Sequence, residues 1–202
     1  NTTKNDSTLP HRAHISRGED HIREKMGDRV LKIHPKSFYQ TNPAQAVRLY
    51  EVAAEMASPT GSETVYDLYC GIGSIGLFVS DQVGRVVGID NVPEAIENAR
   101  ENADANNAAN CSFLQGDVKD LLSDEFVAVH GRPDVVILDP PRAGMHPRVL
   151  KTLMELLPPH IVYVSCNPAT QARDLQELTQ AYEIGRIQPV DMFPQTCHIE
   201  NV

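Results

Sequence analysis

The side chain best placed for covalent chemistry is Cys166, in the run Val164-Ser-Cys-Asn-Pro168. An apolar stretch typical of a buried strand precedes this run, and Pro168 suits the first turn of a helix. At a helix N-terminus the dipole favours the thiolate, which is the nucleophilic form of cysteine. We therefore interpret Cys166 as a nucleophile that forms a covalent bond to its substrate.

A proton acceptor would complete such a mechanism, and two candidates occur in the run Phe193-Pro-Gln-Thr-Cys-His-Ile-Glu200. His198 and Glu200 are two residues apart, so on a strand both side chains would face the same side of the sheet. The residues alone leave both open as the general base. Cys197 should face away from Glu200 and is not expected to be the nucleophile.

A glycine-rich turn supplies a candidate cofactor site. Gly71, Gly73 and Gly76 satisfy G-x-G-x-x-G directly after an apolar strand, a pattern that alone would suit a dinucleotide as readily. Asp67, at the end of that strand, would repel a pyrophosphate bound at the following helix N-terminus. A carboxylate there suits the cationic aminoacyl end of S-adenosylmethionine.

Two more acids close the next two predicted strands. Asp90 is placed to accept hydrogen bonds from both ribose hydroxyls, and Asp117 to bond the adenine amino group. The alternative is that these carboxylates are N-caps of the helices that follow, which applies most strongly to Asp117. Three acids at three successive strand ends favour S-adenosylmethionine as the cofactor.

The fourth predicted strand ends in Leu138-Asp-Pro-Pro-Arg142. This rigid turn lies at the edge where ligands bind in open α/β sheets. Methyltransferases that modify amino groups usually carry an aromatic residue after the prolines. Arg142 stands there instead and disfavours methylation of nitrogen.

Taken together, these motifs resemble those of the RNA uridine-5-methyltransferase family, which modifies ribosomal and transfer RNA. The match covers about residues 28–202. Its motifs, in order, are Phe38-Tyr-Gln-Thr-Asn42, Asp67-Leu-Tyr-Cys-Gly71, Asp139-Pro-Pro-Arg142, Ser165-Cys-Asn-Pro168 with Arg173-Asp-Leu175, and the Phe193–Glu200 run.

The resemblance implies transfer of a methyl group from S-adenosylmethionine to C5 of a uridine in RNA, with ribosomal RNA favoured over transfer RNA. Cys166 would attack C6 of the uracil, which makes C5 nucleophilic, and Glu200 would take the C5 proton. The other site residues it implies are cofactor contacts at Gln40, Tyr69, Ser74, Asp90 and Asp139, and substrate contacts at Phe38, Asn42 and Arg142. Many members carry Asn where this chain has Ser74.

Two alternatives remain open at this stage. A 5-methylcytosine methyltransferase uses the same addition chemistry, but an acid would follow the fourth-strand prolines where Arg142 stands. A non-catalytic RNA-binding protein on a methyltransferase scaffold is disfavoured by the intact Cys166 and Glu200.

Composition is that of an ordinary globular protein, with 41% hydrophobic and 22% charged residues. No apolar run approaches the roughly 18 residues needed to span a bilayer, and the first residues lack the apolar stretch of a signal peptide. The four cysteines form no C-x-x-C pair and lack zinc-finger spacing. We therefore expect reduced thiols, no metal site, no membrane segment and a cytoplasmic location. A monomer is also expected.

The net charge of −9 is unfavourable for RNA binding, because phosphate contacts dominate such affinity. The acidic excess is confined to residues 61–202. Residues 1–60 carry nine Lys and Arg against seven acids.

Strands alternate with helices from residue 63 onward, which predicts an α/β, Rossmann-like methyltransferase fold with a mainly parallel seven-stranded sheet. Residues 61–202 would form the catalytic domain. Residues 1–60 would form an N-terminal segment with a loose stretch over 1–27, a hairpin over 28–41 turning at Pro35, and a helix starting at Pro43. The remaining predicted elements are strands at 64–68, 85–89, 112–115, 135–138 and 161–164, helices at 75–82, 93–106, 118–129, 147–156 and 169–181, and a final antiparallel pair at 184–192 and 197–202.

Overall fold

The computed structural model describes residues 18–202, and at its centre lies a five-stranded sheet in the order β5-β4-β3-β6-β7. All neighbouring strands in this sheet are parallel. The strands are β3 (Thr64–Leu68), β4 (Arg85–Asp90), β5 (Cys111–Gln115), β6 (Val135–Leu138) and β7 (His160–Tyr163). Each begins and ends within one residue of its predicted bounds, so the α/β fold is confirmed.

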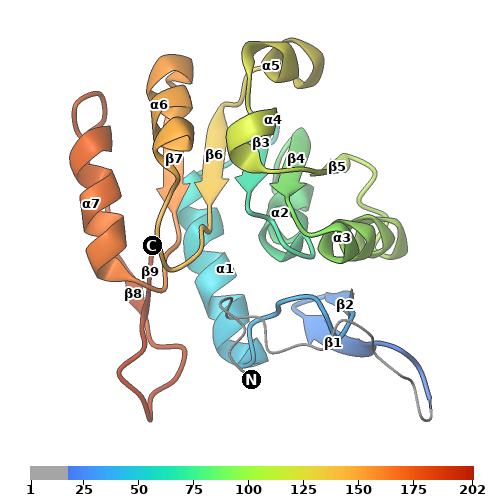
Figure 1. The fold of residues 1–202 in the computed structure, drawn as a ribbon. Helices are drawn as coiled ribbons and strands as arrows, with labels where there is room; N and C mark the ends of the chain where they lie inside the picture. Colours follow the sequence, from blue (N-terminus) through green and yellow to red (C-terminus); the bar gives the residue numbers. More distant parts are fainter. Residues whose placement is uncertain (1–17) are drawn as a thin grey trace, which may run out of the picture.

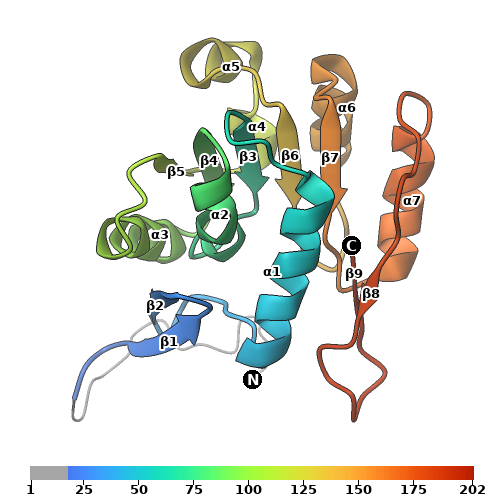
Figure 2. The ribbon, with the colours of Figure 1, turned by 180° about the vertical axis from the view of Figure 1, so that it is seen from behind.

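Helices cover both faces of the sheet (Figures 1 and 2). Successive strand residues point to opposite faces, so Val65 joins one hydrophobic cluster and Tyr66 the other. The first cluster is completed by α1 (Pro43–Ala57), α2 (Ser74–Val79) and α3 (Pro93–Ala105), the second by α4 (Val118–Leu121), α5 (Asp124–His130), α6 (Pro147–Leu156) and α7 (Pro168–Leu178).

Local signals set the helix starts. Proline occupies the first turn of α1, α3, α6 and α7, where its missing N–H leaves no hydrogen bond unmade. Asn42 and Asn167 cap α1 and α7 with their side chains. The single helix predicted over 118–129 is wrong, because Ser123 accepts a hydrogen bond from the Phe126 amide and starts a separate α5.

The N-terminal hairpin lies earlier than predicted. It pairs β1 (Ile22–Met26) with β2 (Arg29–Ile33), and the chain turns at Gly27 rather than at Pro35. Gly27 has φ of 59°, which a tight two-residue hairpin turn requires and only glycine adopts without cost. Residues 35–41 therefore form no strand. The predicted loose stretch over 1–27 is wrong from Ile22 onward, and its first 17 residues lie outside the described part of the chain.

The C-terminal pair is shorter than predicted and separate from the main sheet. It consists of β8 (Pro189–Val190) and β9 (Glu200–Asn201), which are antiparallel. A single bridge between Ser165 and Asn201 attaches it beside the end of β7. The continuous sheet thus has five strands, not seven. None of the helices in residues 18–202 combines the length and apolar character needed to cross a membrane.

Candidate active site

The predicted site residues gather at the carboxyl edge of the parallel sheet. The strand arrows in Figure 1 point toward the side where the β1–β2 hairpin and the β8–β9 pair lie. Loops that follow β3, β4, β6 and β7 therefore meet at one edge, as ligand sites in open α/β sheets do.

A small cavity of about 40 Å³ marks the centre of this edge. One wall is the segment that precedes α1, and the other is the loop between β3 and α2. Six of the predicted site residues line it: Phe38, Gln40, Tyr69, Gly71, Ser74 and Asp139. The structure therefore brings together residues that are up to about a hundred positions apart in the sequence.

Residues of the segment that precedes α1 differ in their exposure to solvent. The Phe38 side chain is 74% exposed, whereas Gln40 is only 7% exposed and faces the cavity. Tyr69 has φ of 66°, a left-handed conformation that is uncommon for a residue with a side chain. The amides of Tyr69 and Cys70 both donate to the Ile89 carbonyl, which holds the loop in this conformation.

Asp90 fastens the glycine loop to the end of β4. Its Oδ2 accepts from the Gly71 amide and its Oδ1 from the Val92 amide, both at 2.9 Å. Each carboxylate oxygen keeps a second lone pair, so the side chain remains able to accept hydroxyl donors.

Asp67 is fully buried, and its Oδ2 accepts from the Gly76 amide at 2.8 Å. A Cβ at Gly76 would lie 2.8 Å from that oxygen, so only glycine allows the approach. The other oxygen, Oδ1, has no protein partner. Burial raises the pKa of Asp67 to about 7, against the lowering effect of the Gly76 hydrogen bond. A buried carboxylate with a free oxygen beside the glycine loop fits a cationic ligand group.

Asp117 takes the alternative role considered from the sequence. It caps α4 by accepting from the Lys119 amide, and its carboxylate pairs with the Lys119 ammonium. That side-chain hydrogen bond lowers the pKa of Asp117. A contact to the adenine of a cofactor stays a prediction.

The second cluster joins Cys166, Arg142 and Glu200. The Ser165–Asn201 bridge sets Glu200 beside the loop that carries Cys166. Glu200 is 7% exposed, and its Oε2 has no hydrogen-bond partner. The Arg142 side chain lies near both groups, and it lowers the pKa of the Cys166 thiol and of the Glu200 carboxyl.

The acidities of this cluster differ from the sequence expectation. Burial, followed by the charge of Glu200, raises the pKa of the Cys166 thiol, although Arg142 opposes the shift. The shift is opposite to the one expected from the helix dipole, because the sequence does not show how deeply the thiol is buried. Burial likewise raises the pKa of Glu200 to about 7. The pKa of Asp139 is raised well above its usual value by burial, with repulsion from Glu200 and Asp67.

Helix α7 holds the loop that carries Arg142. The side chains of Asn167 and Thr170 both donate to the Arg142 carbonyl, at 3.0 and 3.1 Å. Asp174, which is fully buried, accepts from the Met145 amide at the far end of the loop. Asp174 of the Arg173-Asp-Leu175 motif thus stabilises the loop that carries Arg142.

Two predicted residues lie elsewhere or are already engaged. His198 is exposed and precedes β9, so it does not lie on one strand with Glu200, and the condition for a shared face is not met. The strand is too short to impose the alternation. Asn42 caps α1 with its oxygen and donates with its nitrogen to the Met192 carbonyl, so both ends of its amide are used within the protein.

Tyr50 is a site residue that sequence reasoning missed. It lies on the buried face of α1 among apolar side chains, yet it lines the cavity. Burial raises the pKa of its hydroxyl, and an interaction with Ser74 acts in the opposite direction. A lone hydroxyl within a mostly alanine and valine face was the available signal.

A larger cavity, of about 680 Å³, lies at the open edge of β7. None of the predicted site residues lines it, whereas six of them line the smaller cavity. Within residues 18–202 no group of three or more His, Cys, Asp or Glu side chains is arranged to hold a metal ion.

Comparison with known proteins agrees with this geometry. A protein of Bacteroides thetaiotaomicron described as an uncharacterized RNA methyltransferase is 54% identical over 202 residues, all of this chain and 44% of that protein. One of Porphyromonas gingivalis with the same description is 52% identical and likewise covered to 44%. The chain thus spans less than half the length of these relatives.

Methyltransferases are also among the solved structures that match the chain. The Pyrococcus abyssi tRNA (uracil-54, C5)-methyltransferase in complex with S-adenosyl-L-homocysteine matches with a TM-score of 0.80 and 41% identity, over 100% of this chain and 48% of that one. A tRNA m1G37 methyltransferase of M. jannaschii, at 15% identity and a TM-score of 0.63, shares the fold. The family model described as tRNA (uracil-5-)-methyltransferase matches residues 11–202. The chain therefore belongs to the tRNA (uracil-5-)-methyltransferase family.

Proposed function

We propose that this chain is the catalytic domain of an enzyme that transfers a methyl group from S-adenosylmethionine to C5 of a uridine in RNA, through a covalent adduct with Cys166. The observation that carries the proposal is the meeting of Cys166, Arg142 and Glu200 near Asp139, which lines the small cavity. A methyltransferase that acts on a ready nucleophile would need no thiol at this place.

The cofactor assignment rests on the carboxylates and amides of the sheet edge. We assign the ribose to Asp90 and the methionine end to the loop with Gly71 and Gly73. The unpartnered Oδ1 of Asp67 supports a cationic group near this loop. Asp117 would contact the adenine, and the walls of the cavity would come from Gln40, Tyr69, Ser74 and Asp139. When bound, S-adenosylmethionine supplies the electrophilic methyl group.

In the mechanism that we propose, Cys166 first releases its thiol proton to solvent. The thiolate then forms a bond to C6 of the uracil, and the electrons of the C5=C6 bond make C5 nucleophilic. After C5 has gained the methyl group, the Glu200 carboxylate takes the C5 proton. The C5=C6 bond then forms again as the bond from C6 to sulfur breaks and releases the thiolate. Arg142, which opposes the upward pKa shifts of both groups, favours their ionised forms.

The RNA substrate is the less constrained part of the proposal. The Phe193–Glu200 run favours a ribosomal target, whereas the Pyrococcus abyssi protein is named for uracil 54 of tRNA. In either RNA the target base must leave its stack for C6 to reach the thiolate. Phe38, which is exposed at the rim of the cavity, would contact it together with Arg142. Asn42 would act by holding the start of α1, since both ends of its amide are engaged within the protein.

The test is a denaturing gel with labelled cofactor and RNA that contains 5-fluorouridine. Fluorine cannot leave as a cation, so the wild-type protein should accumulate a methylated covalent complex. Cys166→Ala should form no complex. Glu200→Gln should accumulate the complex even with ordinary uridine, because the C5 proton is not removed.

Cys197 provides a matched control, since it is an exposed cysteine close to Glu200 in the sequence. Cys197→Ala should retain the adduct, and an adduct that survives Cys166→Ala would refute the mechanism. Nuclease digestion of the product should yield 5-methyluridine; 5-methylcytidine would establish the alternative base. Ribosomal and transfer RNA from cells that lack the gene, offered separately, identify the substrate.

A further inference from the structure

The β1–β2 hairpin is attached to α3 by three asparagines in one row. Asn98, Asn102 and Asn106 are spaced four residues apart and therefore lie on one face of the helix. Their side-chain oxygens accept hydrogen bonds from the outward-facing backbone amides of β2 and of the residue that follows it. The pairs are Asn106 with Val30 at 3.1 Å, Asn102 with Lys32 at 2.7 Å, and Asn98 with His34 at 2.9 Å.

The three asparagines can bind alternate residues from Val30 to His34 because the spacing along the helix nearly equals the spacing along the strand. Four residues of an α-helix rise about 6.0 Å, and two residues of a strand rise about 6.7 Å. Asn102 and Asn106 also return a hydrogen bond, from their nitrogens to the carbonyls of Lys32 and Val30, each at 3.0 Å. The amides thus replace a neighbouring strand at the outer edge of β2.

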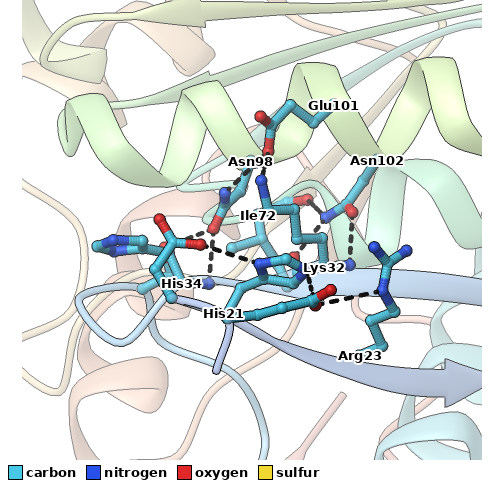
Figure 3. A network of polar contacts seen from close by, with 11 residues as sticks. His21, Arg23, Lys32, His34, Ile72, Asn98, Glu101 and Asn102 are labelled. Atoms are coloured by element: carbon cyan, nitrogen blue, oxygen red, sulfur yellow. Dashed lines mark hydrogen bonds and ion pairs between the residues drawn. The ribbon is translucent and has the colours of Figure 1, made fainter. Parts of the chain in front are cut away.

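Asn102 differs from the other two because it also reaches the glycine loop. It is fully buried, and its Nδ2 lies 3.4 Å from the Ile72 carbonyl as well as 3.0 Å from that of Lys32. The two hydrogens of one amide group are thus shared between the hairpin and the loop that contains Gly71 and Gly73. Figure 3 shows Asn102 pointing from α3 into the space between Lys32 and Ile72.

The same helix anchors the other wall of the cavity. Asn98 accepts from the Ser37 hydroxyl at 3.1 Å, and Lys36 forms an ion pair with Glu94 at 2.7 Å. The next residue along the chain is Phe38, where the lining of the cavity begins. Helix α3 therefore holds both the segment that carries Gln40 and the glycine loop.

We propose that Asn102 is a positioning residue of the cofactor site: with one amide it joins Ile72, in the glycine-loop wall of the cavity, to β2, the strand that leads into the segment forming the other wall. The inference rests on the proposed function, because it assigns the cavity to S-adenosylmethionine. It concerns binding of the cofactor rather than the chemical step, since Asn102 contacts neither Cys166 nor Glu200.

Asn102→Asp is the sharpest perturbation because the shape is retained. The oxygen that accepts from Lys32 remains, but the donor is replaced by an oxygen that faces two carbonyls. We expect affinity for S-adenosylhomocysteine, measured by calorimetry, to fall about tenfold, the equivalent of one lost hydrogen bond. In turnover, KM for the cofactor should rise by a similar factor, while kcat at saturating cofactor stays within about twofold of wild type.

Asn106→Asp is the matched control. It makes the same change in the same row and also removes a bond to β2, but Asn106 does not reach the loop. Its affinity for S-adenosylhomocysteine should stay within about twofold of wild type even if its melting temperature falls. Equal weakening in both variants would overturn the role of Asn102, because general loosening of the hairpin would then explain both.

Amide exchange in the wild-type protein tests the same coupling if Asn102→Asp does not fold. Coupling between two sites is reciprocal, so bound S-adenosylhomocysteine should slow exchange at the Lys32 amide more than at that of Val30. No slowing at Lys32 would refute the proposal. A wild-type protein that does not bind S-adenosylhomocysteine would instead overturn the proposed function itself, and the positioning role with it.

Discussion

Two glycines of the cofactor loop should respond differently to the same substitution. Both have left-handed backbone, with φ of 53° at Gly71 and 78° at Gly73. Alanine at either position therefore incurs a backbone penalty of roughly 1–2 kcal/mol. What distinguishes them is the space around an added Cβ. At Gly71 no atom lies within 4 Å, whereas at Gly73 the ring of Phe113 would be 2.6 Å away and the Ala99 methyl 3.2 Å.

The clash at Gly73 adds an overpacking cost of about 1–3 kcal/mol. Gly73→Ala should therefore lose roughly 2–5 kcal/mol of unfolding free energy, and Gly71→Ala only about 1–2 kcal/mol. At about 2–4 °C per kcal/mol for a domain of this size, the melting temperature of Gly73→Ala should lie several degrees lower. Affinity for S-adenosylhomocysteine, measured by calorimetry, should instead fall more in Gly71→Ala than in Gly73→Ala. The new methyl group at position 71 points into the open space of the proposed cofactor site.

The assay is thermal unfolding of both single variants, supplemented by Phe113→Leu and the double variant Gly73→Ala/Phe113→Leu. A smaller side chain at Phe113 should recover part of the loss, so the two changes should be less than additive. Equal melting temperatures for Gly71→Ala and Gly73→Ala would refute the reasoning, because the clash would then have no energetic consequence.

Two further predictions concern buried carboxylates. Because Glu200 must be ionised to accept a proton and burial raises its pKa to about 7, kcat should fall as the pH drops through about 7. Arg142→Ala should shift the midpoint of this profile upward, since Arg142 lowers that pKa, and a rate independent of pH between 6 and 8 would contradict Glu200 as the base. Burial raises the pKa of Asp67 from 3.8 to about 7, so the folded state binds this proton more tightly than the unfolded state does. The resulting stabilisation is fully present below about pH 4 and is lost as the pH rises through 7. The free energy of unfolding of Asp67→Asn, measured in urea, should therefore equal that of wild type near pH 4 and exceed it at pH 8 by up to about 4 kcal/mol. The same difference between the two proteins at both pH values would show that Asp67 does not titrate in this range.

The sequence by itself determined the elements whose signals are local. The five parallel strands were predictable because each is a short apolar run bounded by turn residues. The starts of α1 and α3 followed from Pro43 and Pro93, since proline fits the first turn of a helix wherever the rest of the chain lies. The glycine loop and the sheet edge that gathers the site followed in turn, because parallel strands bring their carboxyl ends together.

Only the tertiary structure decided how deeply these residues are buried, in which direction their pKa values shift and which of their hydrogen-bonding groups are already engaged. The raised pKa of Cys166 depends on burial and on Glu200, which is distant in the sequence and reaches it through a single bridge to β9. The exposure of His198 and the use of both ends of Asn42 depend equally on contacts between distant segments. Asn102 illustrates the limit most clearly. Its spacing in α3 was visible, but its role arises only because the hairpin and the glycine loop both place backbone carbonyls within reach of one amide.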